Sequence, residues 1–180
     1  MSNQMKDALH VVVDLETLDT RPNAAVLSVG VAFVKTCAVV DAIELRLDLS
    51  EQLMLGRTVS ASTLEWWLDG AKADAQRHTA SLPRYALSTA LESIEARVRA
   101  YGGPKGAFIW GNSPSFDCAI LASLYAAAGM PPWWGYSQEM DLRTLRKFGL
   151  VKWQQPLIAH TALHDAQAEA EELVGYLRTL

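Results

Sequence analysis

Two carboxylates separated by one residue end an apolar run near the start of the chain. Residues 11–17 read VVVDLET, so Asp14 and Glu16 follow three consecutive valines. The β-branched run predicts a buried strand, and side chains two apart on a strand share a face, about 7 Å from each other. Like charges at that spacing repel, and burial disfavours their ionised forms. The pair therefore predicts a site for a divalent cation, with further ligands from elsewhere in the chain.

Two more acids occur where such ligands could come from. Asp117 follows the short apolar run GAFIWGN (106–112), and Asp165 lies in the first turns of a helical segment at the C-terminus. Magnesium takes carboxylate oxygens, water and substrate phosphate as ligands. Two such ions, about 3.5–4 Å apart, can clamp the attacking and leaving oxygens of a phosphoryl displacement. Four carboxylates balance the charge of two ions, so the set predicts two Mg²⁺ or Mn²⁺ ions and metal-dependent stability.

The surrounding pattern predicts an α/β layered fold that forms one domain over residues 1–180. Three strand-like runs with short connections indicate an antiparallel meander, and a further buried strand precedes Asp117. The expected strands are 11–17, 26–35, 37–49 and 106–112. The expected helices are 60–80, 84–103, 114–129, 140–149 and 160–180, the last of them rich in Ala, Glu and Leu.

Composition limits the function classes. Half of the 180 residues are hydrophobic and the net charge is −4, which is typical of a globular domain and argues against a protein that coats nucleic acid electrostatically. No apolar run reaches the length of about 20 residues that a membrane span needs, and the N-terminus lacks a secretory pattern. Cys37 and Cys118 have no metal-binding spacing. We therefore expect reduced thiols in a cytoplasmic protein without a membrane partner.

Three motifs in order resemble a known enzyme family. They are Asp14-Leu15-Glu16, then Asp117 in WGNSPSFDCAIL, then His160-Thr161-Ala162-Leu163-His164-Asp165. Over about 150 residues this order is similar to the DEDDh branch of the DnaQ-like 3′-to-5′ exonucleases. The phrases GRTVSASTLEWWL and EMDLRTL are similar to its phage- and mycobacterial-type exoribonuclease subgroup. The resemblance implies a ribonuclease H-like fold, with a central mixed sheet whose first three strands are antiparallel, flanked by helices.

The resemblance also implies an activity. It predicts hydrolysis of phosphodiester bonds from the 3′ end of RNA or single-stranded DNA, releasing nucleoside 5′-monophosphates. Asp14, Glu16, Asp117 and Asp165 would hold the two metal ions, and His160 would act as the general base that deprotonates the attacking water. His164 is the alternative base. It adjoins Asp165, and neighbouring residues on a helix face different directions.

Several residues are candidates for holding the nucleotide. In the family, the residues after the first motif contact the terminal nucleotide through backbone groups and an apolar wedge, which here implies Thr17 and Leu18. Trp66 could stack on a base. Asn112 and Ser115 could bond sugar or phosphate, although both also suit a helix cap. The tryptophan-rich segment 64–71 could serve a homodimer interface instead of the substrate.

Other functions remain as alternatives, and the nature of the sugar stays open. A catalytically silent nucleic-acid-binding module on the same fold is the main rival, but a pure binder has no need of four mutually repelling acids. A calcium-stabilised structural protein would show a regular loop spacing that is absent here. RNA is distinguished from DNA by a contact to the 2′-hydroxyl, and no residue in the sequence identifies one.

Overall fold

A six-stranded mixed sheet organises the chain. The computed structural model describes residues 2–180, and its strands follow the order β4-β3-β2-β1-β5-β6. Neighbours among the first three strands pair antiparallel, whereas β4, β5 and β6 each join a neighbour in parallel. The strands are β1 (His10–Thr17), β2 (Val26–Lys35), β3 (Ala38–Leu47), β4 (Arg84–Tyr85), β5 (Phe108–Gly111) and β6 (Glu139–Asp141).

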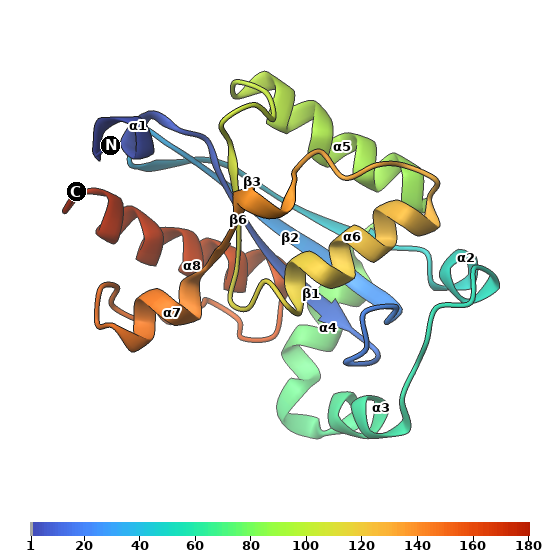
Figure 1. The fold of residues 1–180 in the computed structure, drawn as a ribbon. Coiled ribbons are helices and arrows are strands. Elements are labelled where there is room, and N and C mark those ends of the chain that lie inside the picture. Colours follow the sequence, from blue (N-terminus) through green and yellow to red (C-terminus); the bar gives the residue numbers. More distant parts are fainter. Residues whose placement is uncertain (1) are drawn as a thin grey trace.

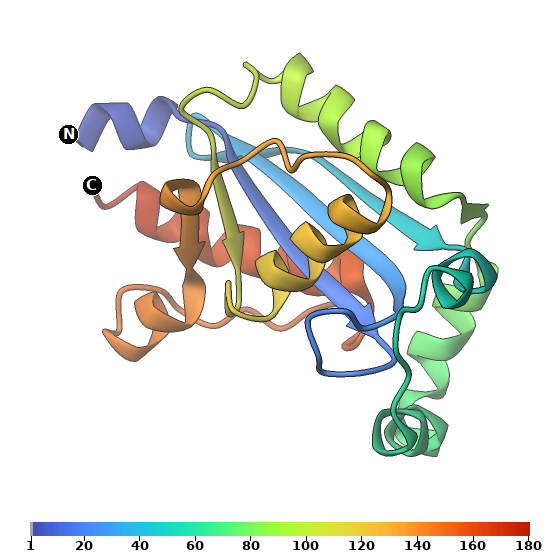
Figure 2. The same cartoon turned by 45° about the vertical axis from the view of Figure 1, so that its right-hand side comes forward.

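Helices cover both faces of this sheet. The long C-terminal helix α8 lies across one face, and α5 and α6 lie on the other (Figures 1 and 2). A separate pair, α3 and α4, lies beside the end of β1 that carries the acidic motif (Figure 2). The helices are α1 (Ser2–Asp7), α2 (Leu49–Met54), α3 (Ala61–Leu68), η1 (Gly70–Lys72), α4 (Ala73–Ser81), α5 (Leu87–Ala100), α6 (Asp117–Ala127), η2 (Tyr136–Gln138), α7 (Leu142–Lys147) and α8 (Ala162–Leu177).

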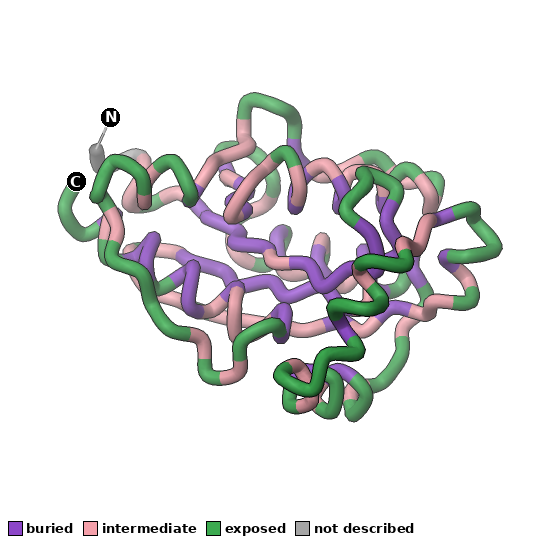
Figure 3. The backbone as a smooth tube through the Cα atoms, turned by 90° about the horizontal axis from the view of Figure 1, so that it is seen from below, coloured by how far each residue is buried: buried purple, intermediate pink, exposed green. Residues whose placement is uncertain are grey.

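The side-chain alternation of β1 divides the core into two layers. Val11 and Val13 pack with residues of α5 and α6, while Val12 packs with α7 and α8. Asp14 and Glu16 continue the series of Val12, so they emerge on the face that α8 covers. Figure 3 shows the strands and the inner sides of the helices as the buried centre of the molecule. The apolar strand thus fixes the direction in which its two terminal carboxylates point.

Helix α8 lies very close to the sheet where β2 carries a glycine. Gly30 is the register partner of Asp14, and a Cβ atom on Gly30 would lie 1.9 Å from the carbonyl oxygen of Ala162. Only a residue without a side chain therefore allows the first turn of α8 to pass over β2. This close approach brings Asp165, three residues further along the helix, beside Asp14 on the neighbouring strand.

We expect Gly30→Ala to destabilise the protein by about 2 kcal/mol or more, because the added methyl group meets backbone rather than a movable side chain. Urea unfolding followed by circular dichroism measures the effect. Gly175→Ala is the matched control in α8. A Cβ atom there meets nothing within 4 Å, so alanine should stabilise the helix by several tenths of a kcal/mol. Equal effects of the two substitutions would contradict the close contact.

The observed elements correct several expected boundaries. The helix expected over 60–80 is broken at Asp69, whose carboxylate accepts a bond from the Ala71 amide and starts a new turn. Residues 84–85 form β4 instead of opening a helix, because they pair with the end of β3. Helix α2 and strand β6 had no expected counterparts, since six and three residues are too few for a periodic signal. No helix in the described part of the chain is long and apolar enough to cross a membrane.

Candidate active site

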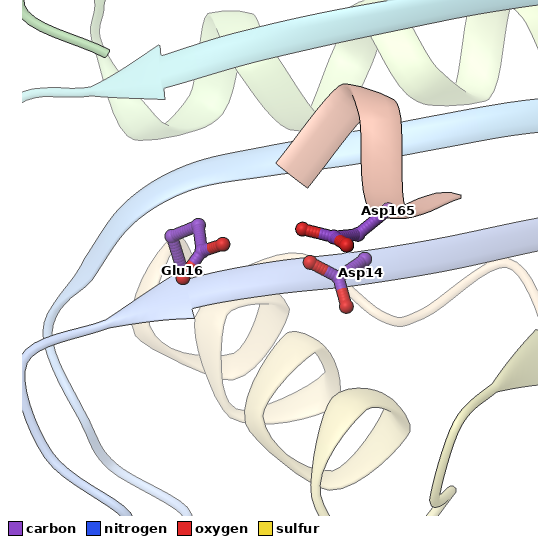
Figure 4. A group of neighbouring side chains, drawn as sticks. All are labelled: Asp14, Glu16 and Asp165. Carbon is purple, nitrogen blue, oxygen red and sulfur yellow. The ribbon is translucent and has the colours of Figure 1, made fainter. Parts of the chain in front are cut away.

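Three of the predicted carboxylates converge at the end of β1. One carboxylate oxygen each of Asp14, Glu16 and Asp165 lies within 4.8 Å of the other two. Figure 4 shows Asp14 and Asp165 pointing toward one another, with Glu16 beside them at the end of the strand. Three convergent hard oxygen ligands are a donor set that suits Mg²⁺ or Mn²⁺. The residues present therefore fit a divalent cation.

Local hydrogen bonds fix the third carboxylate of this group. Asp165 lies in the first turn of α8, where one of its oxygens (Oδ2) accepts a bond of 3.0 Å from the Thr161 amide. A helix N-terminus favours a negative charge, because its first amides have no partner within the helix. The bond holds the Asp165 side chain in place without using its second oxygen. Asp165 is thus oriented before any cation binds.

Asp117 lies next to this group but is not one of the three. It begins α6, which the loop 112–116 connects to β5, and its Oδ2 accepts a bond of 3.1 Å from the Ser113 amide. A Cβ atom on Gly111 would lie 2.7 Å from the same oxygen, so the glycine makes room for the carboxylate. Because β5 runs parallel to β1, the C-terminal ends of both strands lie on the same side of the sheet, and Asp117 follows β5 there as Asp14 lies near the end of β1.

Crowding of these acids shifts their titration. Burial, followed by the repulsion of Glu16 and other carboxylates, holds the pKa of Asp14 well above its usual range. Burial and the negative charge of Asp165 raise the pKa of Glu16 to about 8. Burial also raises the pKa of Asp117 to about 6, although backbone amides oppose that shift. A bound cation would relieve the repulsion between carboxylates crowded in this way.

His160 lies at the edge of the carboxylate group, on the loop before α8. Its backbone is in the left-handed region, with φ of 63°, which is unfavourable for a residue with a side chain and recurs at functional sites. The imidazole packs edge-on against Trp66, with 4.9 Å between ring centroids. His164 lies elsewhere: its Nδ1 is 2.7 Å from the Thr161 hydroxyl, and its ring lies beside His78. His160 is thus the histidine that lines the cavity of the carboxylates.

Two cavities flank the carboxylates and share Leu15 and Glu16 in their walls. The first, of about 400 Å³, is here called the Trp153 cavity. The second, of about 390 Å³, is called the Trp66 cavity. The Trp153 cavity is also lined by Asp14, Asn112, Arg146, Trp153, Gln154, His160, Asp165, Glu169 and Glu172. The Trp66 cavity also contains Thr17, Thr20, Ser62, Thr63, Trp66, Trp67 and Phe116. The carboxylates thus lie at the junction of two hollows.

The predicted substrate residues are divided among these surroundings. Thr17 and Trp66 line the Trp66 cavity, and Trp66 is 41% exposed. Asn112 lines the Trp153 cavity. Leu18 is not among the residues lining either cavity, because it is buried against Trp67, whose indole nitrogen donates to the Thr17 carbonyl. Ser115 also lies outside both linings, and its hydroxyl is 2.9 Å from that of Ser113.

An ion-pair network in the wall of the Trp153 cavity was not predicted from the sequence. Arg146 donates to both oxygens of the buried Glu172, at 2.7 and 3.0 Å, and also contacts Glu169. Its remaining nitrogen donates to Oδ1 of Asn112 at 2.9 Å, which leaves the Asn112 amide N–H groups free for other partners. The signal was the spacing of Asp165, Glu169 and Glu172 at i, i+4 and i+7, which places three acids on one helix face.

Solved structures of E. coli exonuclease I have the same fold. Its zinc-bound complex with single-stranded DNA matches with a TM-score of 0.66 and 13% sequence identity, over 96% of this chain and 41% of that one. Its complex with a dA16 oligonucleotide matches with a TM-score of 0.63, at the same identity and coverage. The chain therefore spans about 41% of the length of exonuclease I. The likeness confirms the predicted ribonuclease H-like arrangement of sheet and helices.

The sequence itself matches a family of domains. No curated protein matches the chain. Residues 9–176, which include all four predicted acids and His160, match the family described as the 3′-5′ exoribonuclease Rv2179c-like domain. That span begins one residue before β1 and ends one residue before the end of α8. The chain belongs to the 3′-5′ exoribonuclease Rv2179c-like domain family.

Proposed function

We propose that the protein is a metal-dependent 3′-5′ exonuclease that acts on RNA, with residues 1–180 as one exonuclease domain. The observation that carries the proposal is the convergence of Asp14, Glu16 and Asp165 within 4.8 Å, with His160 on the same cavity. Family membership supports RNA as the substrate. The fold shared with exonuclease I supports a single-stranded 3′ end, because its solved complexes contain single-stranded oligonucleotides.

The chain's own residues have distinct tasks in this reaction. Asp14, Glu16 and Asp165 would hold one divalent ion, and Asp117 and Asp14 would be suited to a second. When bound, such ions would stabilise the negative charge that develops on the phosphate and on the leaving 3′ oxygen. His160 accepts a proton from the attacking water. The water oxygen bonds to phosphorus as the bond to the 3′ oxygen breaks, the 3′ oxygen of the shortened strand takes a proton from solvent, and a nucleoside 5′-monophosphate leaves.

The experiment is a time course with short RNA labelled at its 5′ end, in the presence of Mn²⁺. We expect a ladder of products that shortens from the 3′ end, together with nucleoside 5′-monophosphates identified by chromatography. Asp117→Ala should lower the rate at least 100-fold, because one carboxylate of the set is lost. Addition of EDTA should stop the reaction.

The same assay separates the proposal from its rival and tests the sugar. Intact strand with both the wild type and Asp117→Ala, alongside retained binding of the strand, would favour the silent nucleic-acid-binding module. DNA of identical sequence, at matched salt, tests whether the enzyme requires the 2′-hydroxyl. Faster cleavage of DNA than of RNA would overturn the choice of RNA while leaving the exonuclease proposal intact.

A further inference from the structure

The proposed reaction requires room for two nucleosides, one on each side of the scissile phosphate. A phosphodiester bond joins the terminal nucleotide to the nucleotide before it, and the carboxylates mark where that bond is cleaved. Two cavities meet at this point, and each has a volume within the range of small-molecule sites. The Trp66 cavity offers an aromatic wall for one base. The Trp153 cavity is the remaining place for the other nucleotide.

Trp153 is an aromatic side chain that the core does not use. It lies on the loop between α7 and α8, lines the Trp153 cavity and remains 64% exposed. The ring lines the same cavity as five carboxylates and is accessible to a ligand bound there. An indole face can stack on any base, and an exposed ring in a groove is the usual form of such a platform.

The chain is held in place directly beside this ring. The backbone amide of Gln154 donates to Oε1 of Glu172 at 3.0 Å, and Glu172 is in turn held by two bonds from Arg146. The Glu172 side chain is fully buried, so this anchor belongs to the body of the protein. The backbone next to Trp153 is therefore anchored to α8, the same helix that carries Asp165.

The loop also shows where the rest of the strand can leave. Leu157, on the same loop, is 84% exposed and lines a neighbouring hollow that shares Gln154, Gln155 and Pro156 with the Trp153 cavity, so this cavity continues onto the surface. The Trp66 cavity is instead bounded by α3, the residues after β1 and Phe116. The Trp66 cavity contains Thr17, the residue predicted to contact the terminal nucleotide, which leaves the Trp153 cavity for the nucleotide before it.

We infer that Trp153 stacks on the base of the nucleotide 5′ to the scissile phosphate, so that the loop 148–160 binds the upstream single strand. The inference rests on the proposed exonuclease function and adds a second nucleotide site to it. It predicts that the enzyme needs an unpaired nucleotide before the terminal one, because a base stacked on Trp153 cannot at the same time stack within a duplex.

Two substrates separate this site from the site of the terminal nucleotide. One is a short single-stranded RNA, and the other is the 5′-p-nitrophenyl ester of uridine monophosphate, which has no upstream nucleotide. Trp153→Ala should lower kcat/KM for RNA relative to kcat/KM for the ester by about 10- to 100-fold, mainly through KM. Trp153→Phe should restore most of this ratio, because a phenyl ring also stacks.

Control variants separate stacking by Trp153 from a general effect of removing an exposed aromatic ring and from a role in an interface between copies. Tyr136→Ala removes another exposed aromatic ring, 91% exposed and outside both cavity linings, and should leave the ratio unchanged. Equal loss on both substrates, or no loss on either, overturns the inference. A change of oligomeric state with Trp153→Ala, measured by light scattering, also overturns it, because Trp153 would then belong to an interface between copies.

Binding decides the inference even if no turnover is seen. If the wild type cleaves neither substrate, the proposed function fails, and the upstream site is then tested by fluorescence anisotropy with labelled single-stranded RNA. Trp153→Ala should weaken this binding about tenfold, while Tyr136→Ala should not. Unchanged binding in both variants overturns the site.

Discussion

Asp14→Asn is expected to abolish metal binding and to lower kcat by at least about 1000-fold. His160→Ala should lower kcat about 100- to 10,000-fold but leave metal binding largely intact. Asp14 belongs to the group whose oxygens converge within 4.8 Å, so its loss removes a cation ligand. His160 lines the same cavity but is absent from that group. Rates on labelled RNA and calorimetric titration with Mn²⁺ measure the two effects separately.

The matched control for His160 is the second histidine of the same motif. His164→Ala removes an imidazole that faces Thr161 and His78 instead of the carboxylates, so kcat should change by less than about tenfold. Equal loss of Mn²⁺ affinity in Asp14→Asn and His160→Ala would contradict the division of labour. A larger loss of kcat in His164→Ala than in His160→Ala would move the role of base to His164.

The substitution at Asp14 should also separate activity from stability. Asparagine has nearly the same shape as aspartate but carries no charge, so it relieves the repulsion between Asp14 and Glu16 in the metal-free protein. The inactive variant should therefore unfold at a higher temperature than the metal-free wild type. Catalytic loss through misfolding would give the opposite result, which makes the melting temperature an internal check on the kinetic comparison.

The sequence was sufficient for those parts of the site that local geometry determines. Alternation along a strand is a local property, so VVVDLET alone predicts that Asp14 and Glu16 share a face. The resemblance then supplied the order of motifs that adds Asp117 and Asp165, and the observed fold agrees with its ribonuclease H-like prediction. These predictions needed no knowledge of distances between elements.

Contacts between elements far apart in the chain could not be predicted from the sequence. The closeness of Asp165 to Asp14 depends on Gly30, because only a missing side chain lets α8 pass over β2. Leu18, predicted as an apolar wedge, is buried against Trp67, since the helix α3 packs over the chain after β1. Trp153 carried no signal, because an isolated tryptophan in an irregular loop has no periodicity to interpret. Each of these features depends on tertiary packing.

Stability of the metal-free protein is expected to fall as the pH rises from 5.5 to 8, by an amount on the order of 3 kcal/mol. The pKa of Glu16 is raised to about 8 in the folded protein, and the pKa of Asp14 is also raised, whereas both return to ordinary values on unfolding. Between the unfolded and the folded pKa values of these groups, the folded state binds more protons than the unfolded state. The stabilisation is therefore complete below the unfolded pKa and is lost as the pH rises through the folded pKa.

Urea unfolding in EDTA at the two pH values measures this difference, and added Mn²⁺ should restore stability at pH 8, where the carboxylates are ionised and able to bind it. Glu16→Gln removes one of the titrating groups and should flatten the pH dependence. Asp74→Asn alters an exposed ion pair with Arg77 and should change it by no more than about 0.5 kcal/mol. Stability that instead increases from pH 5.5 to 8 without metal would mean that the carboxylates lie apart in solution. The repulsion expected to weaken the metal-free fold is the repulsion that a bound cation would relieve, so the two measurements should change together.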